Sequence, residues 1–182
     1  MGRIQDLRMG AMSLKYKGED LGHTKGGLTF KLDRNFEGMT VDQYGDTLVD
    51  LILQGQKATI EVNLAEPSVA KLNLVIPEGN DTVGATGEIM TFGTDAGYSL
   101  RNGGSGALGG GGAGLLVCHP LNKAITDDSE DIQIYMAASS EPIELPYKVK
   151  EQRVYKVTFT AFVDETRANG RRLGHVGPLA IS

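Results

Sequence analysis

The chain is poor in the residue types on which several functional classes depend. Its 182 residues include no tryptophan, and aromatic residues make up only 6% of them. Side chains that stack on sugars or single-stranded bases are therefore scarce. The one cysteine, Cys118, excludes an intrachain disulfide and gives no indication of an oxidising compartment. Hydrophobic residues make up 40%, so we expect one domain with an ordinary apolar core.

Positive charge is also in deficit. The 18 Lys and Arg residues are outnumbered by 23 Asp and Glu, so the formal net charge is −5. This sign opposes nucleic-acid binding by phosphate neutralisation, although an acidic surface suits DNA transit because like charges do not adhere. No apolar run approaches the roughly 20 residues that span a bilayer. Residues 1–14 lack the apolar centre of a signal peptide. We expect a soluble protein made in a cytoplasm, without membrane association.

Alternation of apolar and polar residues predicts a mainly-β fold. In the run 57–66 every second residue is apolar, so one face is buried and the other meets water or another subunit. The apolar set is Ala58, Ile60, Val62 and Leu64, and the polar set is Lys57, Thr59, Glu61 and Asn63. Other strands are expected at about 13–17, 27–32, 47–53, 87–92, 114–119, 131–137 and 153–164. A short helix is expected to start at 66–68, where proline is tolerated in the first turn.

Eight to ten short strands and one short helix favour an antiparallel β-sandwich or partial barrel. We expect a loosely ordered N-terminal arm at 1–12 and a single domain over 13–182. The acidic connector 33–46 is long for a hairpin loop, so either the strands extend into it or the loop is functional. A second loop is expected at 101–114, where glycine dominates.

Three segments of the chain form a recognisable series: GHTKGGLTF at 22–30, VDQYGDTLVD at 41–50 and GQKATIEVNLAEPS at 55–68. This series resembles the major tail tube protein of long-tailed (siphovirus-type) bacteriophages, although Leu48 stands where that family often has proline. The resemblance implies a structural virion protein whose hexameric rings stack into a tube that conducts DNA during ejection. It also implies assembly in the host cytoplasm, location in the virion tail, and tape measure and terminator proteins as partners.

The same resemblance suggests roles for particular residues. The polar face of 57–66 would line the lumen with Lys57, Thr59, Glu61 and Asn63, and its carboxylate would weakly repel DNA phosphates. Contacts between subunits and rings would use the two loops 33–46 and 101–114. The candidate contact residues are Asp33, Glu37, Asp42, Asp46, Gly104 and Gly110. A ring requires heterologous contacts, in which two different faces of the subunit meet.

Catalytic, cofactor and metal motifs are not predicted. Cys118 and His119 are adjacent on a strand and therefore point to opposite faces, which disfavours a nucleophile–base pair. The three histidines lack metal-ligand spacing, and the acidic series of 33–50 lacks the order of a calcium loop. The glycine tract lacks the Lys-Ser/Thr of a phosphate-binding loop. We therefore predict a protein that is not an enzyme and carries no cofactor.

Two alternatives remain open from the sequence. A tail terminator, a tube initiator or a capsid decoration protein would use a similar strand-rich subunit, and would differ in whether its rings stack. A ligand- or receptor-binding β-sandwich belongs to another class, and the absence of tryptophan argues against its sugar-binding form.

Overall fold

The computed structural model describes residues 10–66, 68–76, 80–84, 87–91, 98–103, 112–147 and 152–178. Ten strands and one α-helix occur in these residues, and a short 3₁₀ turn joins two of the strands. In chain order they are β1 (Met12–Tyr16), β2 (Glu19–Asp20), β3 (Thr24–Thr40), the 3₁₀ turn (Asp42–Tyr44), β4 (Leu48–Leu64), α1 (Val69–Val75), β5 (Asn80–Gly84), β6 (Gly87–Thr91), β7 (Gly114–Pro120), β8 (Ile132–Ser139), β9 (Tyr155–Ala161) and β10 (Gly174–Val176).

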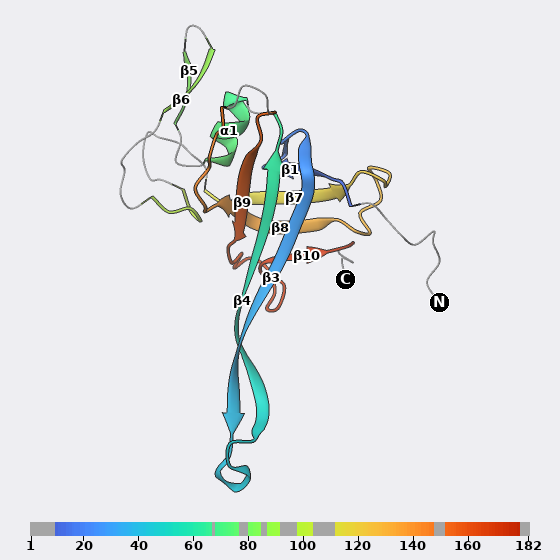
Figure 1. The fold of residues 1–182 in the computed structure, drawn as a ribbon, viewed down its shortest axis with the longest axis vertical. Helices are drawn as coiled ribbons and strands as arrows, with labels where there is room; N and C mark the ends of the chain where they lie inside the picture. The colour runs from blue at the N-terminus through green and yellow to red at the C-terminus, as the bar shows by residue number, and fades with distance from the viewer. Residues whose placement is uncertain are drawn as a thin grey trace.

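Eight strands form one antiparallel sheet in the order β2-β1-β7-β8-β9-β4-β3, with β10 added beside β8. The remaining pair, β5 and β6, forms a separate two-stranded hairpin. β2 and β3 are the two ends of the sheet and do not pair with each other, so the sheet is not closed into a barrel. The predicted mainly-β, antiparallel fold with one short helix is confirmed (Figure 1).

The sheet is folded over a single apolar core, because β8 pairs with different partners along its length. One edge of β8 pairs with β7 from Ile132 to Ala137, while its other edge pairs with β10 at its start and with β9 from Ala137 to Ser139. The two halves of the sheet therefore face each other, and Tyr16 of β1 packs on Phe159 of β9 with ring centroids 5.0 Å apart. The Tyr16 hydroxyl donates a 2.9 Å hydrogen bond to the carbonyl of Ala137, and burial raises its pKa.

Cys118 lies fully buried in this core, and burial raises the pKa of its thiol to about 12. It packs as a small apolar core residue.

Helix α1 closes one end of the core. Ser68 is its N-cap and accepts a hydrogen bond from the Lys71 backbone N–H at 3.2 Å. Leu72 and Val75, three residues apart on one face of the helix, are buried against the core. The predicted short helix is therefore confirmed, while Pro67 lies outside the described residues.

Some boundaries differ from those predicted, and one open alternative is decided. Of the two alternatives for the connector 33–46, the strands extend into it: β3 continues to Thr40, so only 41–47 form the turn. The runs 47–53 and 57–65 are not separate strands but one strand, β4. Regular structure starts at Met12, inside the predicted N-terminal arm, of which 1–9 lie outside the described residues.

The core predicts how two phenylalanines should differ. Phe159 is fully buried, whereas Phe36 is 42% exposed on the hairpin. Phe159→Ala should lower the free energy of unfolding by about 3–5 kcal/mol, because it removes contacts and leaves a cavity. Phe36→Ala should lower it by less than about 1 kcal/mol. Urea unfolding of the dilute chain measures both, and equal losses would contradict this placement of the core.

Candidate assembly surface

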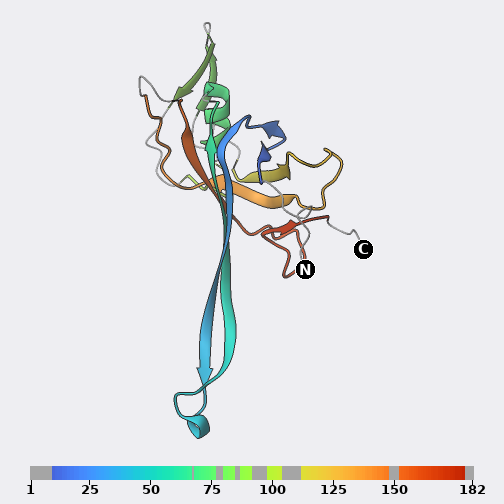
Figure 2. The same ribbon diagram turned by 45° about the vertical axis from the view of Figure 1, so that its right-hand side comes forward.

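The hairpin of β3 and β4 leaves the body of the protein as a long arm (Figures 1 and 2). β4 pairs with β9 only between Thr59 and Leu64, and beyond that its only partner in the described residues is β3. From Asp33 to the turn the arm is thus a two-stranded ribbon with two unpaired edges. Such edges are templates for pairing or packing with another chain, and an isolated hairpin is marginally stable in water.

A bulge at Gln54 determines which side chains share a face of the arm. Asn35 is paired with Gly55, but Phe36 is paired with Leu53, so Gln54 has no register partner. Because one extra residue changes the alternation of a strand, Leu53 is shifted to the face that carries Phe36. That face is continuous with the core-facing side of the sheet, where Leu32 is paired with Ala58.

The arm is consequently amphipathic, with its apolar face in solvent. The large apolar side chains on that face are each between 42% and 53% exposed: Leu32, Phe36, Leu48, Leu51 and Leu53. The register pair Arg34 and Gln56 lies on the same face, between Leu32 and the other four. The opposite face carries Asp33, Glu37, Asp50 and Lys57, with Met39 and Ile52 between them. The apolar strip from Phe36 to Leu48 is of the kind that marks an interaction site on a protein surface.

The tip of the arm combines an exposed aromatic ring with acidic residues. Tyr44 ends the 3₁₀ turn and is 67% exposed. Asp42 and Asp46 flank it, and neither forms an ion pair with any other described residue. Between 35 and 56 the chain has four acidic residues, Glu37, Asp42, Asp46 and Asp50, and no Lys, Arg or His. The distal arm is therefore uniformly negative.

The four residues expected to line a lumen lie together on the face of β4 that points away from the core. Lys57 is exposed, and Glu61 forms a 2.6 Å ion pair with Lys156 of β9. Asn63 is half-buried. Thr59 departs from the expected wet face, since it is only 8% exposed. It is flanked on both sides by its register partners, Lys31 of β3 and Thr160 of β9.

The candidate contact residues of the sequence are brought onto one element. Asp33, Glu37, Asp42 and Asp46 all lie on the arm or its tip, so the acidic series is a property of the arm. Gly104 and Gly110 lie outside the described residues.

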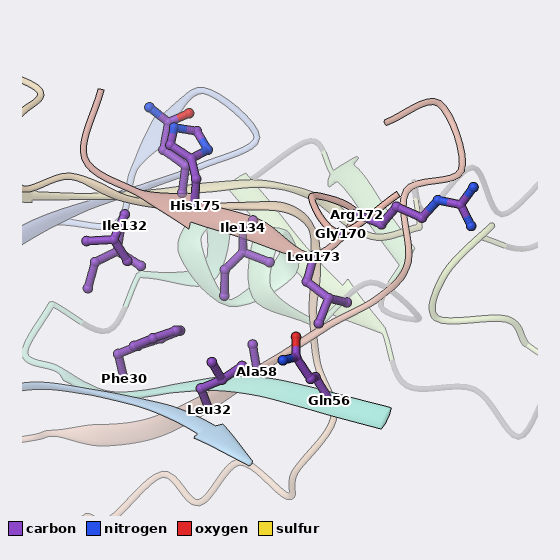
Figure 3. A pocket seen from close by; sticks show the side chains of 13 residues that line it. Phe30, Leu32, Gln56, Ala58, Ile132, Ile134, Gly170, Arg172, Leu173 and His175 are labelled. Atoms are coloured by element: carbon purple, nitrogen blue, oxygen red, sulfur yellow. The ribbon is translucent and has the colours of Figure 1, made fainter. Parts of the chain in front are cut away.

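A groove of about 350 Å³ lies where the arm joins the body. In Figure 3, Phe30, Leu32 and Ala58 of the hairpin lie across from Ile132, Ile134 and Leu173 of β8 and the segment leading into β10. The amide of Gln56 points into the space between them, and the guanidinium of Arg172 extends outward from the rim. The groove is a mainly apolar cleft with few polar groups, as ligand and docking sites are.

The body end of β4, opposite the arm, is tied to α1 by charge. Glu66, just after β4, accepts hydrogen bonds from the backbone N–H of His23 and from the ammonium of Lys71 on α1. The bond from Lys71 is the main cause of the lowered pKa of the Glu66 carboxyl. These contacts hold the body end of β4 against α1.

Another polar cluster lies on β7. The Nδ1 atom of His119 lies 2.7 Å from Asp131, while its Nε2 atom is buried without a partner among the described residues. A catalytic triad would need a nucleophile at Nε2. The nearby Ser13 hydroxyl is instead turned to the His119 carbonyl, to which it donates at 3.3 Å. No group of three or more His, Cys, Asp or Glu in the described residues is arranged to hold a metal ion.

No protein-family model matches this chain, and a search of curated proteins finds no similar one. Within the described residues, no helix has the length and apolar character needed to cross a membrane. The surface described above is therefore interpreted from its own geometry.

Sequence reasoning missed the groove and the apolar face of the arm. The groove combines residues near 30, 57, 133 and 173, and no local pattern links these segments. The signal for the arm was present, because Val49, Leu51 and Leu53 alternate like a strand. These three residues have odd numbers, whereas the core residues of 58–64 have even numbers. The change from even to odd indicates a bulge only if both runs belong to one strand.

The bulge predicts which cysteine pair can form across the arm. Phe36→Cys with Leu53→Cys places two thiols at directly paired positions, whose Cα separation suits a disulfide. Phe36→Cys with Gln54→Cys is the pair that a ribbon without a bulge would join. Under mild oxidation of the dilute chain, mass spectrometry should detect an intramolecular disulfide in the first variant and little in the second. The reverse result would show that the bulge is absent.

Proposed function

We propose that this protein is a structural subunit that assembles with copies of itself into stacked rings forming a phage tail tube. The observation that carries the proposal is the arm: an amphipathic two-stranded ribbon whose apolar face and two edges have no partner in the described residues. A stable ribbon of this kind requires cover from another chain. The resemblance of residues 22–30, 41–50 and 55–68 to tail tube proteins supports a second copy as that chain.

The shape of the subunit supports heterologous contacts. The tip of the arm and the strands that line the groove, β8 and β10, lie at different heights of the molecule (Figure 1). Contacts between unlike surfaces repeat from copy to copy, and they give a closed ring or an open stack depending on the rotation between neighbours. Both outcomes are needed in a tube, which has rings and a repeat between rings.

The outer face of β3, β4 and β9 has the character expected of a wall along which DNA passes without specific binding. Its side chains are polar and short or charged, including Thr29, Glu61 and Thr158. The lysines there are partly neutralised, since Lys31 lies 3.0 Å from Asp33 and Lys156 pairs with Glu61. A face without strong net charge neither grips nor blocks a polyanion. In this role Lys57, Thr59, Glu61 and Asn63 belong to the lumen.

Purified protein should form hollow tubes of uniform width in negative-stain electron microscopy, and size-exclusion chromatography of the same sample should show large assemblies. Single closed rings that never stack would favour a tail terminator or tube initiator. A monomer at all concentrations would count against self-assembly and favour a ligand-binding β-sandwich.

Neighbouring residues on opposite faces of the arm give a matched test. Leu53→Lys places a charge on the apolar face, whereas Ile52→Lys places it on the polar face, and both positions are nearly half exposed. Each variant should keep the unfolding free energy of the dilute chain within about 0.5 kcal/mol. Leu53→Lys should abolish assembly because its ammonium would have to be desolvated, while Ile52→Lys should assemble. Electron microscopy and sedimentation measure the assembly of each variant. Equal assembly of the two variants would contradict the proposal that a second copy covers the apolar face.

A further inference from the structure

We infer that the groove at the base of the arm receives the arm tip of a second copy, with Tyr44 as the inserted side chain and Asp42 and Asp46 facing Arg171 and Arg172. This inference rests on the proposed self-assembly and adds to it the two surfaces that meet. The occupant is a second copy because the tip of the same chain lies at the far end of its own arm (Figure 1). About eight residues of each strand, roughly 26 Å, separate the groove from the turn.

The tip has the composition of an anchor. Tyr44 is 67% exposed, although an aromatic ring is the kind of side chain that contributes most when a neighbour buries it. The backbone holds it out: Tyr44 N–H donates to the Val41 carbonyl at 3.0 Å, and Gly45 N–H donates to Asp42. Gly45 has φ +60°, a conformation that favours glycine and makes the turn tight. The backbone from which the ring projects is thus held in a defined turn.

The groove matches an aromatic ring in size and character. Its volume of about 350 Å³ accommodates one such side chain and part of a neighbouring apolar one. Phe30, Leu32 and Leu173 provide apolar walls (Figure 3). The Gln56 amide points into the space and offers a partner for a phenol hydroxyl. A ring inserted there would be covered on both faces, with its hydroxyl hydrogen-bonded.

Charge complementarity selects this tip for this groove. The turn that borders the groove ends in Arg171 and Arg172, which are both exposed and form no ion pair with a described residue. The acids on the same turn are engaged elsewhere: Asp164 pairs with Arg167, and Glu165 pairs with Arg101. The rim is therefore positive, while the distal arm carries four acids and no base. Opposite charges on the two surfaces fix the register and disfavour tip-to-tip contact.

A tip-to-groove contact has a consequence for the form of the assembly. Each copy uses its tip in one neighbour and its groove for another, so the contact is heterologous and propagates along the direction of the arm. Successive copies are offset by about the length of the arm. Because of this offset, the tip-to-groove contact joins two successive rings.

A charge exchange in full-length protein tests the inference. The tip variant carries Asp42→Arg and Asp46→Arg, and the groove variant carries Arg171→Asp and Arg172→Asp. Each should raise the concentration needed for assembly by at least about tenfold, because like charges then meet. A variant with all four changes should return to within about threefold of the original, as should an equimolar mixture of the tip and groove variants. The matched control, Glu19→Arg with Glu144→Arg, changes exposed acids away from both surfaces by the same charge and should assemble normally.

Cross-linking separates this inference from the proposed tube. Tyr44→Cys chains mixed with Leu173→Cys chains should form intermolecular disulfides, whereas Tyr44→Cys mixed with Leu121→Cys, an exposed site on the β7–β8 turn, should not. Disulfides without tubes would support the tip contact and refute the tube. Tubes that form without these disulfides and that tolerate both charge variants would overturn the inference while leaving the tube intact. If neither the disulfides nor the tubes form, both this inference and the proposed tube are wrong.

Discussion

A two-stranded ribbon has no interior, and this constraint governs the rest of the molecule. The arm of β3 and β4 has backbone hydrogen bonds between its strands but nothing to bury its apolar face. Burying one large apolar side chain completely contributes about 1.5–3 kcal/mol, so five side chains left about half exposed forgo several kcal/mol. The folded monomer therefore retains a strong tendency to cover this strip, and a second copy is the partner we propose.

The body of the protein supports the arm without depending on it. The core is made by both halves of the folded sheet, and Tyr16 and Phe159 meet within it. β4 passes from this core into the arm without interruption, so the arm is an extension of a strand that the core already fixes. The contacts of Glu66 with His23 and Lys71 fasten the other end of β4, remote from the arm, to the body. One end of β4 thus contributes to the stability of the body, and the other end is available for association.

The sequence was sufficient for the fold class and for the faces of single strands. The alternation of 57–66 predicts which residues enter the core, and Ala58, Ile60, Val62 and Leu64 are all buried. It was insufficient where a break in the alternation could mark either the end of a strand or a bulge within it. The segment Gln54–Gln56 suggests a break between strands, yet the pairing across β3 continues through it. Acidic and turn-forming residues likewise made 33–46 resemble a loop, because propensity does not report the neighbouring strand that supplies the hydrogen bonds.

The bulge at Gln54 also limits how the arm can vary in length. Adding or removing one residue between the bulge and the turn would exchange the two faces of that strand, turning leucines outward to the acidic side. Two residues added to each strand would preserve both faces and extend the tip by roughly 7 Å. Natural variation in this arm should therefore occur in matched steps of two, so that the reach of a subunit changes in increments rather than continuously.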